Sequence, residues 1–129
     1  FRGYANYNEI PKILNKYNLY LMPYEKEVYV RSQNIEVGNY MSPLKLFEYM
    51  ASRGVIMASK MKVYEHILNK KNSILVESQS TANWKLNIEN FFMNEKKYNF
   101  LSKNSLRDVK SFTWNSRAGK ILKFINVQN

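Results

Sequence analysis

The chain has 129 residues, the size of one domain, and 45% of them are hydrophobic, which is enough to form a core. The formal net charge of +10 favours an anionic partner: a nucleic acid, an anionic lipid surface or a phosphorylated substrate. The lack of Cys excludes disulfides and thiolate metal sites, the single His excludes a His-rich metal site, and no apolar run approaches the ~20 residues of a membrane span.

The first predicted elements are a strand end, a helix and a strand. Phe1 to Tyr4 is typical of a strand end. Asn8 can cap a helix whose buried face has i, i+3, i+4, i+7 spacing, formed by Ile10, Ile13, Leu14 and Tyr17. Residues 19–22 form the next strand, stopped by Pro23. Residues 24–41 predict a long polar loop with a turn at Gly38-Asn39, and such loops are usually functional or mobile.

The sharpest local pattern is a helix over residues 43–53 with both ends specified. The Ser42 hydroxyl can accept a hydrogen bond from a free backbone N–H of the first turn. Pro43 stands at the first helical position, where its missing N–H is not needed. Gly54 follows the last turn, where a left-handed residue is favoured.

The start of this helix offers chemistry for a phosphorylated ligand. Free N–H groups at Leu44 and Lys45, the positive end of the helix dipole and the Lys45 side chain together suit a phosphate. Glu48, about one turn further on, is an acceptor for hydroxyl groups. The pattern therefore fits a nucleoside diphosphate. On spacing alone, an ordinary capped amphipathic helix with a solvated Glu48 is the commoner explanation.

The rest of the chain predicts two buried strands and a helical end. Residues 55–59 and 73–76 are strands, a short helix over 63–69 lies between them, and the alternation indicates a parallel sheet with right-handed crossovers. Ser59 ends its strand either facing a ligand or as a simple cap, and His66 is expected at the surface. Three helices follow, with apolar faces at Trp84, Ile88, Phe91 and Phe92, at Leu101 and Val109, and at Ala118, Ile121, Leu122 and Ile125.

Four segments in this order, 42–52, 55–59, 63–68 and 72–76, resemble the C-terminal domain of family 4 glycosyltransferases of the GT-B type. Phe1–Tyr4 resembles the family's strand ending in glycine, and 112–118 resembles the start of its last helix. The resemblance covers nearly the whole chain. It implies one Rossmann-like α/β domain over 1–129, with a doubly wound parallel sheet, helices on both faces and a helical C-terminus.

The resemblance implies a retaining, hexosyltransferase-like enzyme of polysaccharide or glycolipid synthesis that binds a nucleotide-diphosphate sugar. Glu48 matches the second glutamate of the family's E-x7-E motif, which binds the ribose, while Tyr40 replaces the first and leaves the sugar unassigned. Tyr4 lies where the family contacts the base. The diphosphate would bind at Ser42, Pro43, Leu44 and Lys45. No catalytic residue is identified, and neither a metal nor a cofactor is expected.

The family's domain also has an upstream strand and helix that supply an Arg and a Lys to the diphosphate, and an N-terminal acceptor domain. Neither matches anything in this sequence. We therefore expect an incomplete donor domain that is inactive alone, with unpaired strand edges where a central strand is missing. The expected location is cytoplasmic, at the inner face of the membrane. Trp84 and Trp114 are expected to be core or helix-packing residues.

The charge leaves alternatives open. The lysines are scattered, so general surface solubility is the first explanation, attraction to a membrane surface the second, and nucleic acid a distant third because no binding signature is present. The alternative function is a non-catalytic, basic Rossmann-like module that binds an anionic partner, either a nucleic acid or an anionic membrane surface.

Overall fold

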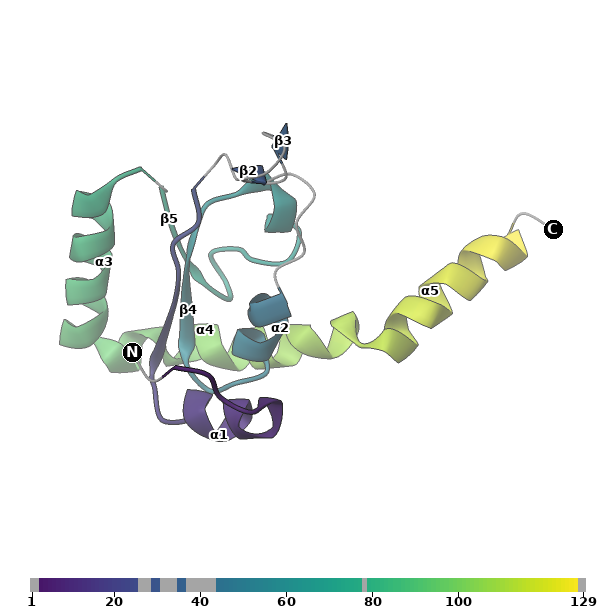
Figure 1. The fold of residues 1–129 in the computed structure, drawn as a ribbon, viewed down its shortest axis with the longest axis horizontal. Helices are drawn as coiled ribbons and strands as arrows, with labels where there is room; N and C mark the ends of the chain where they lie inside the picture. Colours follow the sequence, from purple (N-terminus) through teal and green to yellow (C-terminus); the bar gives the residue numbers. More distant parts are fainter. Residues whose placement is uncertain (1–2, 26–28, 31–34, 37–43, 78, 128–129) are drawn as a thin grey trace.

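The computed structural model describes residues 3–25, 29–30, 35–36, 44–77 and 79–127. A three-stranded parallel sheet in the order β1-β4-β5 lies at the centre (Figure 1). Its strands are β1 (Leu19–Met22), β4 (Val55–Ser59) and β5 (Ile74–Val76). The strands predicted over 19–22, 55–59 and 73–76 are thus confirmed to within one residue, as is their parallel arrangement.

Two apolar clusters cover the two faces of this sheet, because successive residues of β4 point to opposite sides. Ile56 and Ala58 pack with Leu46 and Met50 on one face. The other face carries Val55, Met57, Val76, Phe91 and Leu101. All five residues of β4 are buried, as expected for a strand covered on both faces. The protein is therefore an α/β structure with a small parallel sheet between helices.

The N-terminal segment is shorter and less buried than predicted. A 3₁₀ turn, η1 (Tyr7–Glu9), leads into α1 (Ile10–Leu14), and Gly3 and Tyr4 are not in a strand. Asn8 lies inside η1, so the expected cap at Asn8 is wrong. Asn6 takes the N-cap position of η1, and its backbone N–H donates to the Glu9 carboxylate at 3.4 Å. After α1 the chain tightens into 3₁₀-type bonds, so the predicted apolar face is only half-buried and Tyr17 is exposed.

The predicted central helix is α2 (Leu44–Met50), which buries Leu46 and Met50 completely. Ser42 and Pro43, its predicted cap and first residue, lie outside the described residues. Ser52 closes the far end, where its hydroxyl donates to the Glu48 carbonyl at 2.8 Å.

Gly54 has a role other than the predicted one. Its backbone is not left-handed, so the expected C-terminal cap is wrong. Instead, a Cβ at Gly54 would lie 2.6 Å from Cζ of Tyr20. The Tyr20 hydroxyl accepts from the Gly54 N–H at 3.2 Å and donates to the Leu14 carbonyl at 2.9 Å. Glycine is required here because a buried tyrosine ring lies against the backbone.

Two further predictions about local structure are wrong. Within the segment expected to be a loop, β2 (Tyr29–Val30) and β3 (Ile35–Glu36) form an antiparallel pair, while the Gly38-Asn39 turn falls outside the described residues. The helix expected over 63–69 is only the 3₁₀ turn η2 (Lys62–Tyr64). The Tyr64 hydroxyl donates to the Ser59 carbonyl, which anchors this turn to the end of β4.

The C-terminal half consists of α3 (Thr81–Met93), α4 (Glu95–Asp108), η3 (Val109–Phe112) and α5 (Trp114–Val127). Phe91 and Leu101 bring α3 and α4 onto the sheet, and Trp84 and Ile88 pack against the same cluster. The expectation that Phe92 shares that buried face is wrong, because its side chain is exposed.

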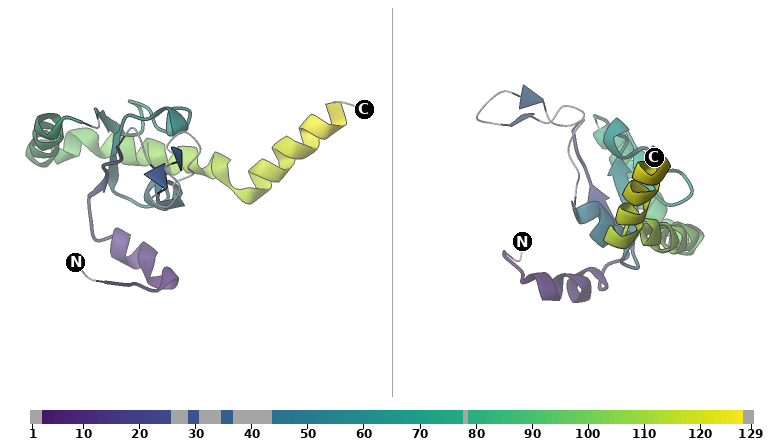
Figure 2. Two further views of the ribbon diagram at one scale, coloured as in Figure 1. Left: turned by 45° about the horizontal axis from the view of Figure 1, so that its top comes forward. Right: turned by 90° about the vertical axis from the view of Figure 1, so that its right-hand side faces the viewer.

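The last helix leaves the body of the protein. In both figures α5 extends beyond the end of α4, away from the sheet (Figures 1 and 2). Trp114 is 82% exposed, so the expectation that it is a core residue is wrong, and Ile121, Leu122 and Ile125 are exposed as well. Helices in the described part of the chain are too short or too polar for any of them to cross a membrane.

Candidate functional site

A cavity of about 520 Å³ lies between α2 and the start of α5; we call it the α2–α5 cavity. Its polar and aromatic walls combine one carboxylate, two cationic side chains and several rings. The described residues that line it are Tyr7, Leu44, Phe47, Glu48, Ser111, Phe112, Thr113, Trp114, Arg117 and Lys120.

Aromatic packing and a buried amide bring the two walls together. The rings of Phe47 on α2 and Phe112 on η3 lie with their centroids 5.6 Å apart. The end of α4, just before η3, is fixed by Asn72, whose side-chain amide donates to Asp108 Oδ2 at 3.1 Å and to the Ile67 carbonyl at 2.9 Å. Asn72 is almost completely buried and Asp108 is half-buried, so this link is partly shielded from water.

The α5 wall begins where the sequence predicts a helix start. The Thr113 hydroxyl accepts from the backbone N–H of Ser116 at 3.2 Å, an N-cap bond that explains why the helix starts at Trp114. One turn on, the Arg117 guanidinium carbon lies 5.7 Å from the centroid of the Trp114 ring. This distance is within the range of a cation–π contact, which holds both groups together at the first turn of α5.

The α2 wall places a carboxylate beside aromatic rings. Glu48 is half-buried and lies next to Tyr49, whose ring stacks on Tyr20 at 4.8 Å between centroids. Burial raises the pKa of Tyr49 above its ordinary value, with smaller contributions from Tyr24 and from the Glu48 carboxylate. Glu48 therefore presents an acceptor for hydroxyls at the edge of a partly desolvated surface.

The structure brings together two of the six predicted site residues. Leu44, although largely exposed, lines the cavity together with Glu48. Lys45 is exposed and does not line it, and Tyr4 is 92% exposed and also lies outside it. Ser42 and Pro43, like Tyr40 of the altered motif, belong to the part of the chain that is not described.

Sequence reasoning missed the contribution of α5 to this site. Trp114, Arg117 and Lys120 recur at intervals of three residues, which places neighbours in the series close together on a helix. That spacing could have indicated a shared site on α5, but Trp114 was expected to be buried. Nothing in the sequence around Tyr7 indicates that it lines a site.

A second cavity, of about 640 Å³, follows the carboxyl ends of β4 and β5. It is lined by Lys60, Lys62 and Lys70 and by the acidic Glu65 and Glu77. Lys60 and Glu77 form an ion pair at 3.5 Å with both side chains largely exposed, which partly neutralises the lysine charge. Like the α2–α5 cavity, this one combines cationic and acidic side chains with one more cation than carboxylates.

Ser59 and Tyr64 close the end of β4 beside the second cavity. Tyr64 lines it, whereas Ser59 is fully buried and its hydroxyl has no hydrogen-bond partner among the described residues. Burial, with a smaller contribution from Tyr24, raises the pKa of Tyr64 to about 12. Tyr64 therefore stays protonated at neutral pH and serves as a structural donor.

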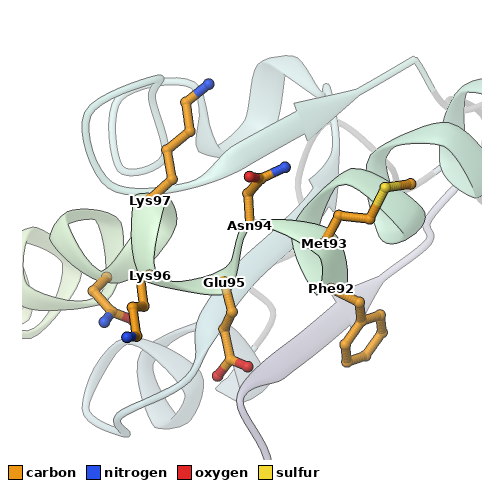
Figure 3. A pocket seen from close by; sticks show the side chains of 7 residues that line it. Phe92, Met93, Asn94, Glu95, Lys96 and Lys97 are labelled. Carbon is orange, nitrogen blue, oxygen red and sulfur yellow. The ribbon is translucent and has the colours of Figure 1, made fainter.

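A third hollow, of about 560 Å³, lies at the junction of α3 and α4. Figure 3 shows that its side chains diverge: Asn94 and Lys97 point to one side of the helix, while Phe92 and Glu95 point to the other. Groups that do not converge cannot surround a small ligand. This hollow is therefore not a candidate site.

Neither a cluster of metal ligands among the described residues nor a match to a family model or a curated protein accounts for the α2–α5 cavity. No three His, Asp or Glu side chains come together within the described ranges, and His66 lies exposed, as expected. No protein-family model matches the sequence, and no curated protein matches it. The chemistry of the cavity must therefore be argued from its own residues.

Proposed function

We propose that the chain is the donor-binding part of a retaining glycosyltransferase and binds a nucleotide-diphosphate sugar in the α2–α5 cavity. One observation carries the proposal: Glu48, Trp114, Arg117 and Lys120 line the same cavity. These are the groups that a nucleoside diphosphate needs, namely an acceptor for ribose hydroxyls, a ring for the base and cations for two phosphates.

Each group has a distinct role in the proposed complex. The Glu48 carboxylate accepts hydrogen bonds from the ribose hydroxyls, which are stronger than bonds between neutral groups. Arg117 binds phosphate oxygens in a bidentate manner, and Lys120 adds a mobile point charge. Trp114, already exposed, offers its ring to the base.

The start of α2 completes the diphosphate site in this proposal. Backbone N–H groups at Leu44 and Lys45, following Ser42 and Pro43, bind phosphate oxygens as the resemblance implies. Fixed dipoles and nearby cations stabilise the negative charge that develops on the leaving diphosphate. Arg117 and Lys120 supply positive charge of the kind that the family takes from its upstream segment.

The finer description of the fold belongs to the same proposal. The small parallel sheet between helices is compatible with part of a doubly wound, Rossmann-like GT-B domain. In such an enzyme a separate N-terminal domain binds the acceptor, and the whole enzyme acts in the cytoplasm at the inner face of the membrane. Polysaccharide or glycolipid synthesis is the corresponding process.

The alternative is a non-catalytic basic module that binds a larger anion. The lysines of the second cavity favour it, together with the net charge of +10. The two functions differ in what they predict for small ligands. A nucleotide site selects among bases, whereas a general basic surface follows charge and salt.

Thermal shift measurements separate the two functions. The chain is heated with UDP, GDP or ADP and, in parallel, with a single-stranded oligonucleotide over a salt series. The donor-binding proposal predicts that one nucleotide raises Tm more than the others and that Trp114→Ala removes this rise. Equal responses to all three, together with a steep salt dependence of oligonucleotide binding, would support the alternative.

A further inference from the structure

The outer half of α5 is an unpartnered amphipathic helix. Ile121, Leu122, Phe124 and Ile125 are each 50–66% exposed. Within the described chain, η3 is the main neighbour of α5, and the left view of Figure 2 shows the helix standing clear of the sheet. The helix thus exposes a continuous apolar stripe to its surroundings.

The charges of this segment are all of one sign. Residues 109–129 contain no Asp or Glu, and their four cationic side chains are Lys110, Arg117, Lys120 and Lys123. At 100° per residue, Lys123 falls opposite the stripe of Ile121, Leu122, Phe124 and Ile125, and Lys120 falls outside it. Arg117, nearer the start of the helix, falls on the same side as the stripe. A helix with an apolar face, a basic opposite face and low net hydrophobicity is typical of helices that lie in a membrane interface.

From these observations we infer that α5 binds an anionic lipid surface, with its apolar stripe between the headgroups and its lysines at the phosphates. The lysine stems can reach along the helix while the ammonium groups stay at the surface. Attraction to anionic lipids adds to the apolar burial, and the positive charge of the whole chain acts in the same direction.

A second copy of the chain is a poorer occupant of this stripe. A coiled-coil seam through Ala118, Ile121 and Ile125 would span only about two heptads, fewer than the three or four of a sustained coiled coil. Leu122 and Phe124 stand at the flanking positions, where coiled coils usually carry charges that pair across the interface. Two copies would also bring lysines near one another with no acidic residue on the helix to compensate.

The test is co-sedimentation of the whole chain with phosphatidylcholine vesicles made with and without phosphatidylglycerol. We expect binding only to the anionic vesicles. Binding should weaken between about 0.1 M and 1 M NaCl, because the Debye length falls from about 10 Å to about 3 Å. Lys120 is shared with the proposed nucleotide site, so the variants below leave it unchanged, and a failure to bind vesicles would leave that site untouched.

Matched variants locate the contact. Ile121→Ser with Ile125→Ser should weaken binding about ten-fold or more. The control, Phe92→Ser with Met93→Ser, removes an even more exposed apolar pair elsewhere and should change little. Lys110→Gln with Lys123→Gln should weaken binding more than Lys96→Gln with Lys97→Gln, although both pairs remove the same charge.

Circular dichroism of each variant shows whether the fold is kept, as expected for exposed positions. Three results would overturn the inference. The parent chain could stay in the supernatant with anionic vesicles. The two apolar double variants could bind equally well. Alternatively, sedimentation equilibrium could show a dimer that Ile121→Ser with Ile125→Ser abolishes, in which case the stripe pairs two copies of the chain.

Discussion

The contact between Tyr20 and Gly54 shows how one residue joins three elements. The Tyr20 hydroxyl bonds to the carbonyl at the end of α1 and to the N–H that precedes β4, while its ring lies against the Gly54 backbone. No pattern in the sequence predicts this contact, because a glycine after a helix usually serves as a C-terminal cap. The structural reason is a side chain 34 residues away in the sequence.

The glycine contact can be tested by a single methyl group. Gly54→Ala should destabilise the protein by roughly 1–3 kcal/mol, because the Tyr20 ring must shift within a packed core. Gly119→Ala is the matched control: its Cβ would meet nothing within 4 Å, and alanine is favoured in a helix by about 0.5–1 kcal/mol. Urea unfolding measures both. Equal stability of the Gly54→Ala variant and the parent would contradict the contact.

The buried Tyr64 makes stability depend on pH in the alkaline range. Its pKa rises from about 10 in the unfolded chain to about 12 in the folded protein, so above pH 10 the unfolded chain releases a proton that the folded protein retains. The contribution is therefore fully present below pH 10 and is lost as pH rises towards 12. Urea midpoints measured from pH 8 to pH 12 should fall through this window.

A phenylalanine control assigns this effect to Tyr64. Tyr64→Phe should lower stability by about 1 kcal/mol at neutral pH, because it leaves the buried Ser59 carbonyl without its donor. It should also flatten the decline above pH 10. An alkaline decline as steep in the variant as in the parent would mean that other tyrosines cause it.

At the scale of elements, the three strands of the parallel sheet were predictable, whereas β2, β3 and several helices were not. Residues 19–22, 55–59 and 73–76 are short apolar runs between turn signals, and burial in a parallel sheet accounts for them directly. The predicted helix after β4 is wrong, because hydrogen bonds from the Tyr64 and Asn72 side chains to backbone carbonyls hold this segment in an irregular conformation. Helix α5 shows the i, i+3, i+4 pattern of a buried helix, yet nothing covers it in the described chain.

The candidate site was predictable only where it depends on local sequence. Glu48 follows from the spacing on one helix and from the family resemblance. Arg117 and Lys120 join it because α4 ends beside α2, a consequence of the packing of Phe47 on Phe112. Such a convergence of distant segments leaves no mark in a single sequence.

The buried Asn72 side chain also contributes to this convergence, because it joins the end of α4 to the segment after η2. Asn72→Ala should cost about 1–3 kcal/mol, because it removes the donor to Ile67 and Asp108 and the acceptor for the Asn69 N–H. Asn87→Ala removes an exposed hydrogen bond from the Asn87 side-chain amide to the Asn83 carbonyl within α3. This variant should change stability by less than about 0.5 kcal/mol. Thermal unfolding of the two variants compares them. Similar Tm values for both would show that the Asn72 link is not structural.

For the whole molecule, the proposed function implies half of a catalytic unit. Transfer requires donor and acceptor to be held together, and the proposed function assigns only a donor site to this chain. We expect no multiple-turnover transfer when the 129-residue chain is incubated with labelled nucleotide sugars and candidate acceptors. Both transfer and slow hydrolysis are scored. Repeated turnover by the chain alone would require an acceptor site that the described residues do not show.

The most direct test of the central claim is calorimetric titration of the chain with the nucleoside diphosphate that gives the largest thermal shift. Glu48→Gln and Arg117→Gln should each weaken binding about ten-fold or more, since each removes a charge-assisted hydrogen bond. The matched variants Glu89→Gln and Arg53→Gln, at exposed positions outside the cavity, should bind like the parent. Unchanged affinity in both cavity variants would contradict a nucleotide site between α2 and α5.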